Sequence, residues 1–418
     1  MLFFRECKKI LFTLTFLVYS LAACAMYFSQ FHGDLDEPIA MPDPGMDSYG
    51  FIARESPDIM VPAAIESLVG EYLSGSYTAY PYGFIKYVRL TESEKSRIAD
   101  IIFQVSGITK ETLDSFENYD PGGYYMDENG SMVYIKPVIP EINIPTDLTY
   151  ERFRNLMREA DKIIGGGSRY SDDFIVQNFS RIPKTYEDAL AEYEQFINDD
   201  KITGAYARLY CDYMGIVVAV LPVFPAAALA NQDRKSHMDQ LVYSKKISSG
   251  RLVATRFFSL VAVTTIPVFV TAVIANIKIY NLYSSYTMDQ FAFFRYTLFW
   301  LVPNIMTATA VGMLITEVSS GLLAIFVQGA WWFASVFTSS GRLTGNIGRF
   351  TLEMRHNSLS DRDVFYAVWE NIVFNRVFFT LMSCLAVALT VLIYAQKRRG
   401  KISDLPFQIH NKNTKRQS

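Results

Sequence analysis

The stretch FAFFRYTLFWLVPNIMTATAVGMLITEVSSGLLAIFVQGAWWFASVFT, from Phe291 to Thr338, decides the fold class. A helix rises about 1.5 Å per residue, so roughly 20 apolar residues cross a hydrocarbon core of about 30 Å. This stretch is more than twice that length, and the run Glu317-Val318-Ser319-Ser320-Gly321 predicts a tight polar turn within it. We therefore expect two membrane-spanning helices here.

Four more apolar segments each predict one further span. They are Ile10 to Tyr27, Leu209 to Ala230, Phe257 to Ala275 and Val377 to Ala395. A charge at mid-bilayer costs about 2.5–3.5 kcal/mol on insertion scales. Asp212 and Arg295 are expected near span ends, where they can reach the interface. The predicted fold class is a polytopic α-helical membrane protein with about six transmembrane helices.

Prolines lie inside several of the predicted spans, at Pro222, Pro225, Pro267 and Pro303. Each removes an intrahelical hydrogen bond and favours a kink. Kinks suit helices that rearrange around a translocation path, but they also occur in static membrane helices.

The segment from Gln30 to Arg208 is strongly acidic. It carries 31 acidic and 16 basic residues, a local charge of −15, whereas the rest of the chain carries +12. So acidic a block is a poor partner for nucleic acid. All four cysteines, Cys7, Cys24, Cys211 and Cys384, lie outside it, which excludes a disulfide framework or a thiolate metal site within the block.

Local patterns predict that this block is folded, mixed α/β and mostly helical. Thr91 and Glu94 match a capping box, followed by an apolar helical face at Ile98, Ile101, Ile102 and Val105. The run from Tyr124 to Ile135 predicts a hairpin about Asn129-Gly130. Further helices are expected over Tyr150 to Ile164 and Tyr186 to Ile197.

Lys and Arg in the short loops predict the orientation in the cell membrane. Basic residues gather in the first nine residues, between Gln232 and Arg256, and in the tail that opens Gln-Lys-Arg-Arg-Gly-Lys. Six spans with both termini cytoplasmic place all three basic pieces inside and the acidic block outside. The expected units are 1–29 (N-terminus and first span), 30–208 (extracytoplasmic domain), 209–395 (five spans, with a cytoplasmic segment 231–256 and an outer segment 339–376) and 396–418 (cytoplasmic tail).

The first span has an alternative interpretation. Leu21-Ala22-Ala23-Cys24 matches a lipobox, after which a bacterial lipoprotein is cleaved and lipidated, and basic residues before an apolar run also describe a signal peptide. The apolar run continues through Met26, Tyr27 and Phe28, which favours a retained span. Both alternatives leave the acidic block outside.

Motifs for catalysis or cofactor binding do not stand out, and we expect neither enzyme activity nor a cofactor. The chain has no Gly-x-x-x-x-Gly-Lys-Ser/Thr phosphate loop and no His-Glu-x-x-His zinc motif. Gly165-Gly166-Gly167-Ser168 lacks the lysine and predicts a flexible turn after a helix. Aligning Gly130 with the glycine of a calcium loop puts Tyr125 and Lys136 where carboxylates belong, so we reject that site.

The segment from Asn231 to Arg251 is the most informative part of the predicted cytoplasmic face. Asn231 is predicted to cap a short helix in which Met238, Leu241 and Val242 form an apolar patch. Such a helix offers a surface to a cytoplasmic partner. A basic loop resting on anionic headgroups explains the same residues equally well.

This segment resembles the coupling helix in permeases of type-2 ABC transporters, which docks on a separate ATPase subunit. The resemblance rests on Asp233, Arg234, Met238, Leu241, Ser244, Ile247, Ser248 and Arg251. His237 stands where the family often has a glycine. The order of one span, a large outer domain and five spans also fits, and the family's short helices before the last span would fall within Asp361 to Asn375.

The resemblance implies the membrane subunit of an ATP-driven exporter. Its partners would be an ABC-type ATPase subunit, a second permease chain of the same or another kind, and membrane lipid. The alternative is a non-transporting surface receptor or assembly factor that uses the outer domain as its binding module. A peptide, a lipid or a drug-like amphiphile would each fit as substrate.

Overall fold

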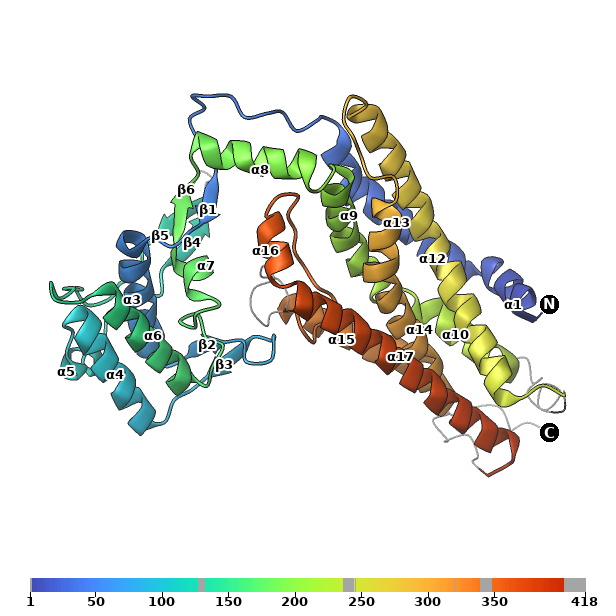
Figure 1. Cartoon of the computed structure of the whole chain (residues 1–418). Helices are drawn as coiled ribbons and strands as arrows, with labels where there is room; N and C mark the ends of the chain where they lie inside the picture. The colour runs from blue at the N-terminus through green and yellow to red at the C-terminus, as the bar shows by residue number, and fades with distance from the viewer. Residues whose placement is uncertain are drawn as a thin grey trace.

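The computed structural model describes residues 2–126, 132–235, 244, 246–319, 321–338 and 348–401. Helices make up 66% of the structure. Figure 1 shows a bundle of long helices and a smaller unit of short helices and strands, joined to the bundle through α8 (Tyr186–Asn198). The predicted acidic block supplies the smaller unit.

The bundle contains most of the apolar sequence. Its elements are α1 (Leu2–Leu11), α2 (Leu14–Met26), a π-helical turn η1 (Tyr27–Phe31), a 3₁₀ turn η2 (His32–Leu35), α9 (Thr203–Val218), α10 (Val223–Lys235), α12 (Ser249–Leu282), α13 (Ala292–Tyr296), a π-helical turn η3 (Thr297–Leu301), α14 (Val302–Val318), α15 (Gly321–Thr338), α16 (Arg362–Ala367) and α17 (Trp369–Arg398). Four helical stretches in the described residues are long and apolar enough to cross a membrane: Leu14–Leu35, Ser249–Leu282, Ala292–Val318 and Trp369–Arg398. The bent pair α9–α10 makes a fifth if it counts as one span. This composition is compatible with a helical membrane protein.

The five apolar segments picked out from the sequence fall on helices and the turns between them, and α14 ends at Val318, within the predicted polar turn. The first segment differs in its limits. Thr13 caps α2 by accepting a hydrogen bond from the backbone N–H of Phe16 at 3.2 Å, so α1 is a separate short helix. The apolar helix then continues to Leu35, beyond the predicted start of the acidic block at Gln30.

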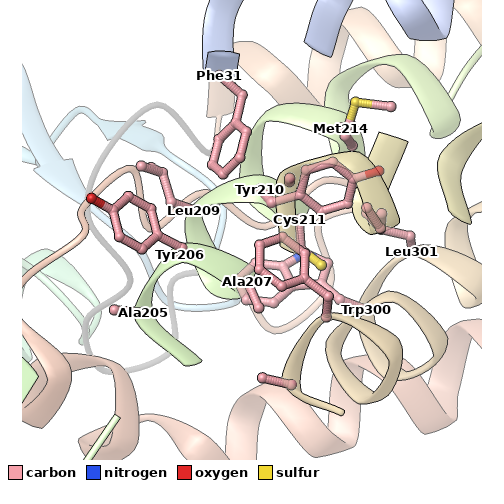
Figure 2. Packing of buried hydrophobic residues seen from close by; sticks show 14 of the residues in the cluster. Phe31, Ala205, Tyr206, Ala207, Leu209, Tyr210, Cys211, Met214, Trp300 and Leu301 are labelled. Atoms are coloured by element: carbon pink, nitrogen blue, oxygen red, sulfur yellow. The ribbon is translucent and has the colours of Figure 1, made fainter. Parts of the chain in front are cut away.

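The centre of the bundle is built around α9. Figure 2 shows Tyr206 and Tyr210 of α9 packed among Phe31 of η1 and Trp300 and Leu301 of η3. The hydroxyl of Tyr210 also donates to the carbonyl of Val268 in α12 at 2.6 Å. The phenol groups on α9 therefore bury apolar surface and still satisfy their polar ends.

The break between α9 and α10 confirms the predicted kink at Pro222 and Pro225. The two helices meet at a bend of 40°. The carbonyls of Ala219 and Ile216 accept hydrogen bonds from Gln328 at 2.6 Å and Trp332 at 2.8 Å, both on α15. A broken helix is tolerated in lipid only where neighbouring helices satisfy the freed backbone groups.

The other two prolines behave differently. Helix α12 runs on through Pro267, and Pro303 opens α14 directly after the π-helical turn η3.

The two ends of the bundle are distinguished by different ion pairs. At one end α1 packs on the start of α12, where Glu6 and Arg256 lie 3.6 Å apart. At the other end Lys278, near the end of α12, pairs with Asp36 at 2.7 Å. We call the first the basic end, because it gathers Arg5, Lys8, Lys9, Lys246, Arg251, Arg256, Lys397, Arg398, Arg399 and Lys401. We call the second the block end.

The acidic block is mixed α/β and mostly helical, as predicted. Besides α8, its elements are β1 (Phe51–Ala53), α3 (Pro57–Ser74), β2 (Tyr77–Ala79), β3 (Lys86–Val88), α4 (Glu92–Ser106), α5 (Lys110–Asp114), β4 (Gly123–Met126), β5 (Met132–Ile135), α6 (Tyr150–Ile164), α7 (Ile175–Phe179) and β6 (Arg181–Pro183). The strands pair antiparallel as β1–β6, β2–β3 and β4–β5. The β4–β5 pair confirms the predicted strands, while the turn at Asn129-Gly130 lies outside the described residues.

Local signals in the block are confirmed residue by residue. Thr91 and Glu94 form both hydrogen bonds of a capping box, and Ile98, Ile102 and Val105 are fully buried. Helices α3, α4, α6 and α7 share one hydrophobic cluster with β2. Strand β1 pairs with β6 in the register Phe51↔Pro183, which brings the entry and exit of the block together beneath α8.

Gln328 provides a test of the broken span. Replacing it with Leu leaves the carbonyl of Ala219 buried without its donor, which costs about 1–3 kcal/mol. We expect a lower unfolding midpoint in detergent, measured by thermal denaturation. The matched change Gln396→Leu, at an exposed position of α17, should leave the midpoint nearly unchanged. Equal midpoints for the two variants would contradict this account of the bend.

Candidate functional site

The residues predicted to contact an ATPase fall at the basic end of the bundle. Asp233 and Arg234 belong to the last turn of α10, while Met238 and Leu241 lie outside the described residues. Asn231 lies inside α10, so the predicted cap at this residue is wrong. The helix continues because Asn231 and Ala227 pack against Gly321, where a Cβ would lie 2.6 Å from Asn231 Nδ2.

Ser244, Ile247, Ser248 and Arg251 lie between α10 and the first turn of α12. Ser248 caps α12 by accepting from the backbone N–H of Arg251 at 3.2 Å. The side chains of Ser244 and Arg251 are exposed. Ser248 therefore has a structural role of its own, whatever docks beside it.

Ile247 ties this segment to α17. Its side chain is half-buried against a cluster that includes Leu252 and Tyr394, and its carbonyl accepts a hydrogen bond from the guanidinium of Arg398. The adjacent Lys397 donates to the carbonyl of Glu317 at 2.5 Å and pairs with its carboxylate at 3.3 Å. The end of α17 thus holds both the α10–α12 connection and the α14–α15 turn.

An irregular segment enters the bundle between α15 and α16. We call residues 348–357 the inserted loop, and its members Thr351, Leu352 and Glu353 are fully buried. Irregular backbone buried in a helical bundle needs partners for every N–H and C=O. The amide nitrogen of Asn375 on α17 lies within hydrogen-bond distance of three of these carbonyls, those of Gly348, Arg349 and Thr351, at 2.6, 3.1 and 2.9 Å, and its two N–H groups are shared among them.

Arg376 joins the inserted loop to α14. Its guanidinium is 2% exposed and donates to the carbonyl of Trp300 and to Asn304 Oδ1, each at 2.8 Å. It also donates to the carbonyl of Leu352 in the inserted loop at 3.4 Å. The carbonyl of Trp300 lies in the π-helical turn η3, so the arginine donates to the backbone where the regular helical hydrogen-bond pattern changes.

Glu353 is the buried carboxylate of the same network. Asn304 uses its amide nitrogen to donate to Glu353 Oε2 at 3.1 Å, so Asn304 bridges the arginine and the glutamate. Oε1 of Glu353 has no hydrogen-bond partner in the described part of the chain. Gly215 makes room for it, because a Cβ at that position would overlap Oε1 and lie 2.8 Å from Cδ.

Asp212 corrects one expectation from the sequence. It was expected to reach the membrane interface, but its side chain is fully buried. Its carboxylate accepts from the backbone N–H groups of His356 at 3.0 Å and Asn357 at 2.7 Å, and Arg355 lies 3.3 Å away. The carboxylate therefore closes the inserted loop instead of leaving the bundle. Arg295 is exposed and pairs with Asp289, in agreement with its predicted position.

A further ion pair fixes the junction between the bundle and the block. Asp200 binds Arg208 through two hydrogen bonds of 2.6 Å, and Arg362 of α16 lies 3.3 Å from the same carboxylate. The turn between them holds Ile202 at a φ of 63°, a backbone conformation that is rare for a β-branched residue. The strained turn aims Arg208 at Asp200.

Hydropathy placed two residues of this network outside the last predicted span. Asn375 and Arg376 were placed in a loop before the last span, because apolar windows stop at charged residues. The helix instead starts at Trp369 and carries both residues into the bundle. Four buried polar residues, Asp212, Asn304, Arg376 and Glu353, thus come from α9, α14, α17 and the inserted loop.

Chemically, this network joins segments of the bundle through hydrogen bonds and ion pairs. Its polar groups are occupied with one another and with backbone, apart from Glu353 Oε1. Among the described residues no group of three or more His, Cys, Asp or Glu side chains could hold a metal ion. Gly165, Gly166 and Gly167 form the turn after α6, as predicted, and the carbonyl of Gly167 accepts from Tyr80 at 2.6 Å.

Comparison with known proteins adds no family to this description. No protein-family model matches the chain, and no curated protein or solved structure matches it significantly.

The close contact at Gly215 yields a prediction. Gly215→Ala should displace the carboxylate of Glu353 and break its bond to Asn304, a charged hydrogen bond worth about 1.5–3 kcal/mol. The gain of up to about 1 kcal/mol in helix propensity offsets only part of this loss. We expect a lower unfolding midpoint in detergent.

Gly329→Ala is the control, because a Cβ on that glycine of α15 meets nothing within 4 Å. Its midpoint should stay the same or rise. In a Glu353→Ala background the Gly215→Ala change should cost less, since the two sites are coupled. Additive effects of the two substitutions would show that the carboxylate is not held against α9.

Proposed function

We propose that the chain is the membrane-spanning permease subunit of an ATP-driven ABC exporter. Two permease chains form the path, and a separate ATPase subunit docks on the segment from Asp233 to Arg251. The observation that carries the proposal is the attachment of Ile247 to Arg398. It connects the predicted docking segment to a helix that reaches the buried polar network.

Helix α17 is the element suited to transmit the movement. It runs without a break from Trp369 to Arg398, and Arg376 lies about 33 Å from Arg398 at 1.5 Å per residue. A displacement at the basic end therefore reaches the contacts of Arg376 with α14 and the inserted loop. ATP binding shifts the permease between two states to the extent that the ATPase pair binds one of them better.

Orientation forms part of the same proposal. The basic end lies in the cytoplasm, where Lys and Arg are retained next to membrane spans, and the acidic block lies outside the cell. This arrangement supports docking, because the segment from Asp233 to Arg251 and the start of α1 then lie on the side that holds ATP. The chain itself has no phosphate-binding loop, so nucleotide hydrolysis falls to the partner.

Cysteine labelling tests the orientation. In a background without native cysteines, Ser115→Cys in the block should react with an impermeant maleimide on intact cells. Ser244→Cys should react only after lysis, because it lies at the basic end. Both serines are exposed. Labelling of position 244 from outside would reverse the proposed topology.

Docking is tested by charge and apolar changes in the same segment. Replacing Met238 and Leu241 together with Asp removes two apolar anchors, worth about 1.5–3 kcal/mol each when buried. We expect this variant to reach the membrane yet lose co-purification with its ABC-type ATPase.

The matched variant replaces Lys245 and Lys246 with Gln, which removes charge and no apolar anchor. It should still co-purify with the ATPase. If the segment mainly rests on anionic headgroups, at about 1 kcal/mol per charge, the lysine variant should be the more damaged. That ranking would remove the support for an ATPase partner.

A further inference from the structure

The acidic block contains a cavity that no part of the proposed transport mechanism uses. It has a volume of about 380 Å³ and lies against one face of α3, across from Arg169 and Phe179. The size is within the range of pockets that hold small organic ligands. Gly70 lines the cavity and has no side chain to fill it. A Cβ at this position would lie 3.6 Å from the hydroxyl of Tyr119, in van der Waals contact.

The cavity presents one unpaired positive group. Arg169 lines it, and Nε of its guanidinium is buried without a hydrogen-bond partner. Within the described residues no hydrogen bond or ion pair involves this guanidinium. Arg169 is half-buried, and its Nε–H is left without the partner that a buried donor requires. A planar anion such as a carboxylate would supply one by binding the guanidinium through two parallel hydrogen bonds.

Two carboxylates line the same cavity, in different states. Glu71 is satisfied, since it accepts from the backbone N–H of Thr78 at 3.0 Å and from the hydroxyl of Tyr170 at 2.7 Å. Burial raises the pKa of Glu71, and these hydrogen bonds and the charge of Arg169 offset only part of that rise. Glu66 is half-buried and pairs with no cation in the described residues.

The charges of Arg169, Glu66 and Glu71 favour a ligand that carries both a positive and a negative group. A simple anion would meet Glu66 and Glu71 in a block of charge −15, and a simple cation would meet Arg169. A molecule with a carboxylate and an ammonium group on neighbouring atoms compensates both. We propose that the cavity binds a free amino acid, with its carboxylate on Arg169, its ammonium on Glu66, and its side chain against the rings of Tyr119 and Phe179.

The binding site does not depend on the exporter assignment, because every lining residue belongs to the block. Binding there would make the block a sensor of extracellular amino acids, or a receiving site for them.

Thermal shift and calorimetry on the detergent-purified full chain test the proposal. The probes are the standard amino acids, added singly, with acetate and methylammonium as one-charge analogues. We expect at least one amino acid to raise the unfolding midpoint in a saturable manner, because a ligand that binds only the folded state stabilises it. Neither analogue should do so at the same concentration.

Three variants locate the effect. Arg169→Gln and Glu66→Gln should each weaken binding at least tenfold, and Gly70→Leu should abolish it by filling the cavity without changing a charge. Arg97→Gln, which breaks an exposed pair with Glu159 elsewhere in the block, should bind normally. If Arg169→Gln does not fold, Glu66→Gln and Gly70→Leu decide the matter.

The proposal is overturned if no amino acid binds, if acetate binds as well as the amino acids do, or if binding survives in Gly70→Leu.

Discussion

The guanidinium of Arg376 is the constraint around which the block end of the bundle is arranged. A buried charge is tolerated only when hydrogen bonds surround it. Here the partners come from the π-helical turn at Trp300, the amide of Asn304 and the inserted loop at Leu352. The departure of α13–α14 from regular helix and the entry of an irregular loop into the bundle are therefore linked: each offers the carbonyl that the arginine needs. Gly215 belongs to the same arrangement, because its lack of a side chain leaves room for the carboxylate of Glu353.

Signals carried by neighbouring residues predicted the elements well. The capping box at Thr91, the helix from Tyr150 to Ile164 and the polar turn after Val318 depend on interactions within a few residues, which the sequence displays directly. Asp212 could not be placed in the same way, because its partners His356 and Asn357 lie 144 and 145 residues away. Arg376 was missed for a related reason: hydropathy treats a charge as the end of a span, whereas tertiary contacts allowed the helix to begin earlier. The residues of the proposed docking segment came from resemblance, and two of them, Met238 and Leu241, lie outside the described residues.

The two ends of the bundle solve the problem of irregular backbone in different ways. At the block end, amide and guanidinium side chains of α17 satisfy the carbonyls of the inserted loop. At the basic end, Lys397 and Arg398 of the same helix donate to the carbonyls of Glu317 and Ile247. One long helix thus supplies hydrogen-bond donors to loops at both ends of the bundle. Its conformation is fixed by polar contacts near its termini, and the apolar middle is left to pack against neighbours or lipid.

The pairing of β1 with β6 has a consequence for how such a chain can diversify. Residues paired across antiparallel strands lie about 4.5–5.5 Å apart, so the block leaves and rejoins the bundle through a narrow neck at Phe51 and Pro183. The length and fold of the chain between Phe51 and Pro183 do not change the distance between these two residues. The block is therefore interchangeable in principle: recombination at the neck could replace one outer module by another, or by a short hairpin, while the helices below keep their register. Such a layout separates the evolution of the block from the evolution of the helical bundle.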